Sequence, residues 1–270
     1  MDGVIDLSLW QMAAAYIFIV ILLFIVRARG ISREKEILIS TVRMTLQLIL
    51  TGYILVYLFN NVNPLLTIII IVAMEAFAIY NIIKRAKVNL SKSLKRIIAI
   101  SMLSGTLSSL AFFLFVVVRI SPWYDPRYFI PIAGMLIGNS MTGISLGVTR
   151  LVDGFRSHSH LVESALMLGA TPKMAAKEIV DNAFDSAILP TINSMVGMGI
   201  VFLPGMMTGQ ILSGTSPVTA IEYQIAIMLG ILGSVSLTVI LFVQLGYKTF
   251  FNYHSQLIGN DYVDDNDCHL

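Results

Sequence analysis

Residues 188–212 read ILPTINSMVGMGIVFLPGMMTGQIL, a stretch long and apolar enough to cross a membrane. A hydrocarbon core of about 30 Å needs about 20 residues of helix. The last third of this stretch nevertheless contains Pro204, Gly205 and Gln210, which a helix facing only lipid would not need. Irregular backbone at membrane depth is tolerated where it faces protein or a water-filled cavity. We therefore predict that Pro204 kinks a spanning helix, that Gly205 eases the bend, and that 204–210 forms the outer part or gate of a pathway.

The composition of the whole chain places it in a membrane. Of its 270 residues, 56% are hydrophobic and 13% are charged, and the mean hydropathy is +0.81. Soluble domains average about 25% charged residues. The formal charge of +2 is too small to suggest a nucleic-acid partner. The single cysteine, Cys268, excludes an internal disulfide.

Apolar runs predict an all-α, multi-pass membrane protein with about seven spans, at residues 8–26, 37–59, 64–83, 97–118, 128–148, 188–212 and 221–246. Alternating these spans from an outside N-terminus puts 15 of the 18 Lys and Arg residues in cytoplasmic segments. The positive-inside rule favours this orientation, with a cytoplasmic C-terminus, in the cytoplasmic membrane of the cell. Residues 1–270 then form a single transmembrane domain that ends in a short acidic tail, 261–270.

The largest soluble segment, about 159–187, connects the fifth and sixth expected spans on the cytosolic side. Its apolar residues recur at three and four positions, which predicts helix. Gly169 suits the end of one helix, and Thr171 followed by Pro172 suits the N-cap and first position of the next. A cytosolic helical hairpin is therefore expected. It is either a connector packed under its own bundle or a docking element for a partner protein.

Ionisable groups inside a bilayer are costly, so each is a candidate functional residue. Glu75 lies about twelve residues into the third span and is the only acidic side chain near a bilayer midplane. Two interpretations stay open: a buried ion pair with Arg43 of the second span, or a carboxylate that contacts a transported cation. Gln47 follows Arg43 by four residues and so shares its helical face, which indicates a polar seam facing protein.

Other polar and soft side chains in the spans are weaker pathway candidates. Asn139, Asn193 and Gln210 are amides in apolar surroundings, which either join helices or line a pathway. Methionine is usually flexible apolar filler, although several methionines cluster in the two spans that flank the hairpin. We include as pathway candidates Met141, Met206, Met207 and Thr208. Glycines four residues apart, at 134 and 138 and at 143 and 147, predict close helix approach in the fifth span.

Part of the hairpin resembles the coupling signature of ABC importer permeases, a Glu-Ala-Ala with a downstream Gly and Ile. Glu163, Ser164 and Ala165 match it, and Gly169 follows Glu163 by six residues. The chain departs from the signature at 181–182, where Asp-Asn stands in place of Leu-Pro.

Longer stretches resemble the FetB-type iron-export permeases, a family also filed as uncharacterised protein family 0014 and similar to plant membrane proteins of aluminium tolerance. These stretches are VRMTLQLILTGYIL, IAGMLIGNSMTG, VESALMLGATP and LPTINSMVGMGIVFLPGMMTGQILSGTSPVTAIEYQI. The resemblance runs from about residue 33 to residue 244. It implies a permease that dimerises, pairs with a separate ATPase subunit and moves a metal ion, iron by the family's assignment, out of the cytosol.

The resemblance also implies a set of residues that bind in a groove of the ATPase subunit: Glu163, Ala165, Gly169, Ala170 and Pro172. The chain has no GxxxxGK[ST] phosphate loop, so any ATP must be used by a partner, and no cofactor is expected on this chain. Paired catalytic carboxylates and nucleophile–base motifs are missing from the sequence, so an enzyme is not expected. Three alternatives remain: an ion-coupled secondary transporter in which Glu75 carries a proton, an ABC permease for a non-metal cargo, and a membrane scaffold or receptor without a pathway.

Overall fold

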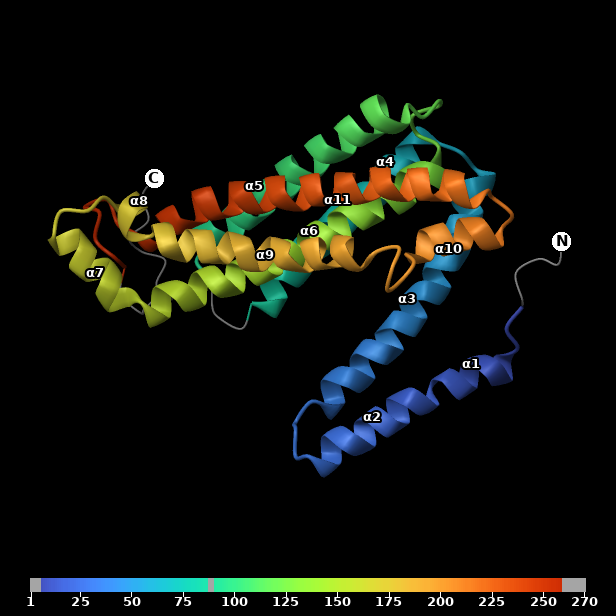
Figure 1. Ribbon diagram of the computed structural model, residues 1–270, viewed down its shortest axis with the longest axis horizontal. Coiled ribbons are helices and arrows are strands. Elements are labelled where there is room, and N and C mark those ends of the chain that lie inside the picture. The colour runs from blue at the N-terminus through green and yellow to red at the C-terminus, as the bar shows by residue number, and fades with distance from the viewer. Residues whose placement is uncertain (1–5, 87–89, 259–270) are drawn as a thin grey trace.

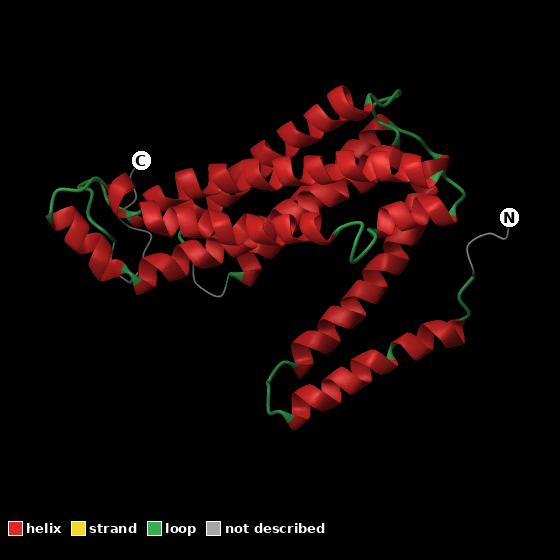
Figure 2. Ribbon diagram, viewed as in Figure 1, coloured by secondary structure: helices red, strands yellow, loops and turns green. Residues whose placement is uncertain are grey.

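The computed structural model describes residues 6–86 and 90–258, and its regular structure within these ranges is helical (Figure 2). The elements are α1 (Leu9–Ala15), α2 (Ile17–Ala28), α3 (Glu34–Asn60), α4 (Pro64–Arg85), α5 (Lys92–Phe112), the π-helix η1 (Phe113–Val118), α6 (Pro126–Ser157), α7 (Ser159–Met167), α8 (Pro172–Ala175), α9 (Lys177–Gly197), α10 (Gly205–Leu212), α11 (Pro217–Gly246) and the 3₁₀ helix η2 (Tyr247–Phe250). The expected all-α class is confirmed. The tail 261–270 lies outside the described residues.

Short polar residues set where the long helices begin. The Asn63 side chain accepts a hydrogen bond from the backbone N–H two residues later at 2.8 Å, and Asp125 does the same at 3.0 Å. Each cap is followed by a proline at the first helical position, where a missing N–H costs nothing. α4 and α6 therefore start at positions that the sequence itself marks.

Five long helices, α4, α5, α6, α9 and α11, pack into one bundle, with α11 in contact with α5, α6 and α9 (Figure 1). Glycines allow the closest approaches. A Cβ added at Gly143 of α6 would lie 2.9 Å from Val235 of α11, and one added at Gly105 of α5 would clash with Thr238. The close approach expected in the fifth span is found at Gly143, whereas Gly138 has open space beside it.

The first three helices lie largely outside this bundle. Figure 1 shows α2 and α3 as a hairpin that diverges from the bundle toward the end where α7 lies. The buried residues of these helices are only Val26 of α2 and Leu58 of α3. α3 touches the bundle through a small contact with α6. Most of the apolar surface of α1–α3 is therefore free to face lipid or another protein.

The expectation of a continuous, kinked helix at 188–212 is wrong. α9 ends at Gly197, residues 198–204 form an irregular loop, and a separate eight-residue helix, α10, begins at Gly205. Gly199 has φ +83°, a left-handed conformation that interrupts the helix, and its N–H donates to the Phe202 carbonyl at 3.0 Å. Pro204 then lacks an N–H and disfavours helical backbone at the residue before it. Two glycines and a proline within eight residues thus produce a break where a kink was expected.

Six helical segments in the described residues are long and apolar enough to cross a membrane: Leu9–Ala28, Glu34–Asn60, Pro64–Arg85, Lys92–Val118, Pro126–Ser157 and Pro217–Phe250. They match six of the seven expected spans, and the seventh is the α9–α10 segment with its break. The chain is accordingly a multi-pass membrane protein. Its orientation in the membrane stays a prediction. The end of the bundle that carries α7 and α8 is called the hairpin end, and the opposite end, which carries α10, is called the α10 end.

Candidate transport pathway

Glu75 lies in the interior of the bundle and is 2% exposed. The Thr106 hydroxyl of α5 donates to Glu75 Oε1 and also reaches the Met102 carbonyl at 2.6 Å. The second carboxylate oxygen, Oε2, is buried and has no hydrogen-bond partner in the described residues. Glu75 therefore connects α4 with α5.

The ion pair between Glu75 and Arg43 is not formed. Arg43 is exposed on α3, and its guanidinium lies over the Phe77 ring of α4, 5.1 Å from the ring centroid. The two side chains are kept apart because Glu75 points toward α5, while α3 diverges on another side of α4. Gln47, one turn further along α3, is also exposed. The polar face expected on this helix exists, but the single chain leaves it uncovered.

Asn139 and Asn193 do not join helices. The Asn139 amide donates to the Met135 carbonyl of its own helix at 2.8 Å, and both side chains are exposed. Close contacts of Gly154 with Ile179 and of Gly147 with Ala187 fix an antiparallel register between α6 and α9. In that register Asn139 falls opposite residue 194. The two amides therefore lie at nearly the same level along the bundle.

A polar pocket of about 380 Å³ lies at the hairpin end of the same pair of helices. Charged side chains of both signs line it, with Arg150, Asp153 and His158 on one side and Glu178 on α9. Sequence reasoning missed these residues because they fall beyond the apolar runs. Their spacing was the available signal, since polar residues recur every three or four positions on α6 and on α9.

The pocket and the amides belong to one side of the α6–α9 pair. We call this surface the α6–α9 seam and define it by Asn139, Arg150 and Asp153 of α6 and by Glu178, Asn182, Ser186 and Asn193 of α9. Asn182 and Ser186 line the pocket, and Asn193 follows Ser186 by about two turns on the same side of α9. A polar track thus leads from the hairpin end toward the middle of the bundle.

The remaining pathway candidates lie on α10 or in the core. Met207 is buried, whereas Met206, Thr208 and Gln210 are half-buried, and Gly205 is exposed. The Thr208 hydroxyl donates to the Pro204 carbonyl at 3.0 Å, which stabilises the start of α10. Two of the methionines, Met141 and Met206, pack against the apolar core, as filler does. In the described ranges no group of three or more His, Cys, Asp or Glu side chains is arranged to hold a metal ion.

The helix end and helix start expected at 169–172 are present, but only α7 and the four-residue α8, 159–175, lie outside the long helices. Residues 177–187, expected in the hairpin, belong to α9 of the bundle. α7 ends at Met167, Gly169 has φ +90°, and the Thr171 hydroxyl accepts from the Met174 N–H at 3.4 Å. Of the expected coupling residues, Glu163 and Gly169 are exposed, whereas three are half-buried, namely Ala165, Ala170 and Pro172. Sequence reasoning missed the tip residues Met167 and Leu168, which are 81% and 89% exposed.

These features define an α-helical, multi-pass membrane protein with a polar seam on its bundle and a helical hairpin at one end. The chain matches the Uncharacterised protein family (UPF0014) over residues 9–251 and belongs to that family.

Proteins from bacteria and plants are similar over nearly the whole chain. UPF0014 membrane protein YjkA of Bacillus subtilis (strain 168) is 32% identical over 93% of this chain and 98% of its own. Protein ALUMINUM SENSITIVE 3 of Arabidopsis thaliana is 35% identical over 94% of this chain and 91% of its own. The protein named "Probable iron export permease protein FetB" of Escherichia coli (strain K12) is 34% identical over 92% of this chain and 94% of its own. No solved structure matches the chain significantly.

Proposed function

We propose that this chain is the permease subunit of an ABC transporter that exports a metal ion, with iron as the cargo. ATP is hydrolysed by a separate subunit, this chain carries no cofactor of its own, and two copies form a homodimer. The name of the E. coli relative supports the reaction and the cargo. The alignment covers more than nine tenths of both chains, so the proposal concerns the whole membrane domain.

The observation that carries the proposal is the exposed hairpin. Residues 159–175 extend past the bundle (Figure 1), and their tip exposes Met167 and Leu168 beside Gly169. Large apolar side chains outside a membrane that face water mark interaction surfaces. Short helices that insert apolar side chains into a groove are a common recognition mode. We infer that the partner is an ATP-binding subunit and that the tip binds in a groove on its surface.

In the proposed mechanism, closure of the ATPase dimer moves the hairpin and tilts the two helices that flank it. These helices are α6 and α9, which carry the α6–α9 seam. At the far end of α9, the loop 198–204 provides a hinge before α10. The seam leads the cation from the cytosol, and α10 with its half-buried Met206 and Thr208 forms the outer gate.

The test is transport by the two-subunit complex. The chain is co-reconstituted with an ATP-binding cassette subunit from the same genome in liposomes, and ATP-dependent movement of iron, manganese, copper and aluminium is compared. We expect ATP-dependent iron movement that disappears when the phosphate-loop lysine of the ATPase is substituted. A complex that forms and moves another of these metals faster than iron contradicts the choice of cargo. A complex that stimulates ATP hydrolysis but moves none of them favours a non-metal cargo.

The same preparation distinguishes the ABC proposal from the alternative of a secondary transporter. The chain alone, in liposomes with a proton gradient and no ATPase, should move no iron. Glu75 would be the proton carrier in that alternative, and the structure holds it between α4 and α5 against Thr106. Gradient-driven uptake by the lone chain would replace the ABC proposal with proton coupling.

A further inference from the structure

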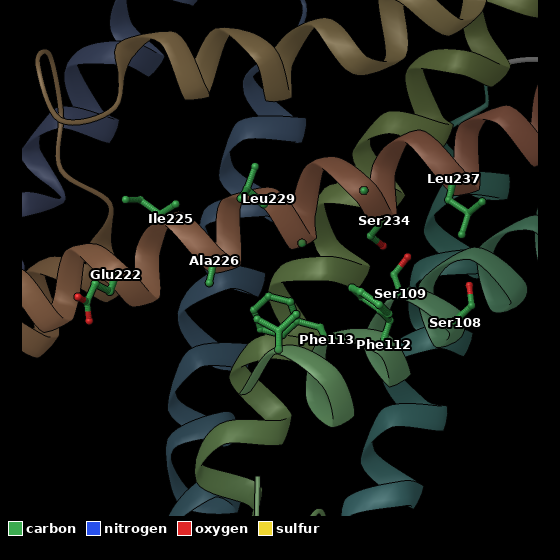
Figure 3. A pocket seen from close by; sticks show the side chains of 13 residues that line it. Ser108, Ser109, Phe112, Phe113, Glu222, Ile225, Ala226, Leu229, Ser234 and Leu237 are labelled. Carbon is green, nitrogen blue, oxygen red and sulfur yellow. The ribbon is translucent and has the colours of Figure 1, made fainter. Parts of the chain in front are cut away.

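A long apolar groove runs between α11 and the α5–η1 helix, and no residue of α6 or α9 lines it (Figure 3). Its volume is about 660 Å³. The α11 wall extends from Glu222 to Leu237, and the opposite wall extends from Ser108 to Val117 across the start of the π-helix. The transport proposal uses none of these residues.

Two glycines of α11 create the groove. The Phe113 ring packs where Gly230 has no side chain, because a Cβ there would lie 2.7 Å from the ring. One turn further, Gly233 has no atom within 4 Å of the position of a Cβ, so the space beside it is open. Leu229, Leu237 and Phe112 flank this opening (Figure 3). The hollow therefore presents apolar walls at bilayer depth.

An acidic side chain lies at one end of the groove. Contacts of Phe113 with Gly230 and of Gly105 with Thr238 fix the antiparallel register of α5 and α11. In that register Val117, at the end of its wall, lies toward the Glu222 end of the α11 wall. Glu222 is exposed and lines the groove mouth. The α10 end of the groove thus offers one anionic group.

In the described part of the chain, the other end of the groove is lined by no charged side chain, and its polar groups are the hydroxyls of Ser108, Ser109 and Ser234. The Ser108 hydroxyl donates to the Ser104 carbonyl at 2.6 Å. The buried Ser234 hydroxyl pairs with Ser140 of α6 at 3.0 Å. Hydroxyls that are already satisfied inside the protein do not require a polar ligand. The inner end of the groove is therefore suited to a hydrocarbon tail.

We propose that this groove is a binding site for one phospholipid with a zwitterionic, primary-amine headgroup, such as phosphatidylethanolamine. Its ammonium group pairs with Glu222, and an acyl chain lies over Phe113 and Gly233. The α11 wall from Glu222 to Leu237 is about 22 Å long. Half of a hydrocarbon core is about 15 Å, so the groove accommodates a chain that crosses one leaflet. A carboxylate favours a primary ammonium over choline, because only the former donates N–H hydrogen bonds.

The test measures retained lipid on the purified full chain. The protein is delipidated in detergent, offered equal phosphatidylethanolamine, phosphatidylcholine and phosphatidylglycerol, and examined by native mass spectrometry. We expect one bound lipid, with phosphatidylethanolamine preferred over each of the others by about tenfold. Gly233→Leu fills the groove and should abolish this single-lipid peak. Gly52→Leu, on a position of α3 that also has open space, should retain it.

Glu222→Gln should keep the bound lipid but bind the ethanolamine and choline lipids about equally. Equal retention by wild type and Gly233→Leu, or a preference for phosphatidylglycerol over phosphatidylethanolamine, overturns the proposal. A change of oligomeric state in Gly233→Leu at unchanged lipid retention would also overturn it, since the groove would then be a subunit interface. None of these measurements involves transport, so their outcome is independent of the proposed function.

Discussion

At the scale of single residues, the contact between Glu75 and Thr106 connects two helices in an apolar interior. Thr106→Val keeps the shape of the side chain and removes the hydroxyl, which leaves both carboxylate oxygens of Glu75 without a partner. We expect the free energy of unfolding in detergent to fall by about 1 to 2 kcal/mol. Equilibrium unfolding followed by circular dichroism measures this change.

Ser101→Ala is the matched control on the same helix. The Ser101 hydroxyl is buried and has no hydrogen-bond partner in the described residues, so removing it leaves nothing unsatisfied. Its free energy of unfolding should stay equal to that of the wild type or rise slightly. A loss in Ser101→Ala as large as that in Thr106→Val would show that the Glu75 contact contributes no more than ordinary packing.

Some residue-level features could be predicted from sequence. An acidic residue in the middle of an apolar run had to be buried or paired, and Glu75 is buried. Its partner could not be predicted, because Thr106 is 31 residues away on a helix whose rotation is set by packing. Arg43 was the candidate that charge alone suggested. The divergence of α3 from the bundle, which no local pattern encodes, excluded that pair.

At the scale of elements, the hairpin tip is the surface on which the proposed binding of the ATPase subunit depends. Leu168→Asp places a charge on a side chain that is 89% exposed and should leave the fold intact. If the tip enters a groove of the ATPase, the Kd of the complex should rise about thirtyfold or more, as for other central apolar contacts. Co-purification and a titration of ATPase binding to the reconstituted chain measure the change.

Tyr253→Asp provides the control for that experiment. Tyr253 is 97% exposed and follows η2, whose Phe250 stacks on Phe155 near the end of α6. It therefore presents an apolar ring near the hairpin end on a segment that is not part of the hairpin. We expect its ATPase affinity to be unchanged. Equal weakening by both substitutions would indicate a general charge effect and remove the specific role of the tip.

Helix boundaries were predictable where a residue had a single local role. Each of three N-cap residues is followed directly by a proline at the first helical position: Asn63, Asp125 and Thr171. The turn at Gly169 was expected because the glycine follows the apolar pattern of the first hairpin helix. The break at 198–204 was underestimated as a kink at Pro204. Gly199 adopts a left-handed conformation just after the end of α9, and a glycine in an apolar run does not by itself indicate that role. A glycine has several possible roles, and only the surrounding backbone decides among them.

At the scale of the whole molecule, the described residues place polar groups on the outside of a well-packed bundle. Asn139 and Asn193 are exposed at one level of α6 and α9, and Arg43 and Gln47 are exposed on α3. Polar groups at bilayer depth are costly against lipid, so these faces require water or protein. Hydropathy identified the spans, but it could not show which side of each helix would remain uncovered. That property depends on the assembly of all the helices.

The α6–α9 seam should therefore be wet, and the single cysteine of the chain makes this testable. In a Cys268→Ser background, cysteines are introduced at Asn182 and Asn193 in the seam and at Leu229 in the apolar groove. Only the thiolate reacts, and a lipid-facing thiol ionises poorly. We expect a water-soluble maleimide to label both seam positions at least about tenfold faster than Leu229→Cys, since each unit of pKa changes the thiolate fraction tenfold. Equal rates at Asn193→Cys and Leu229→Cys would place Asn193 against lipid and end the polar track at the hairpin pocket. Faster labelling at Asn193→Cys would instead show that water extends from that pocket to the middle of the bundle, along the proposed cation pathway.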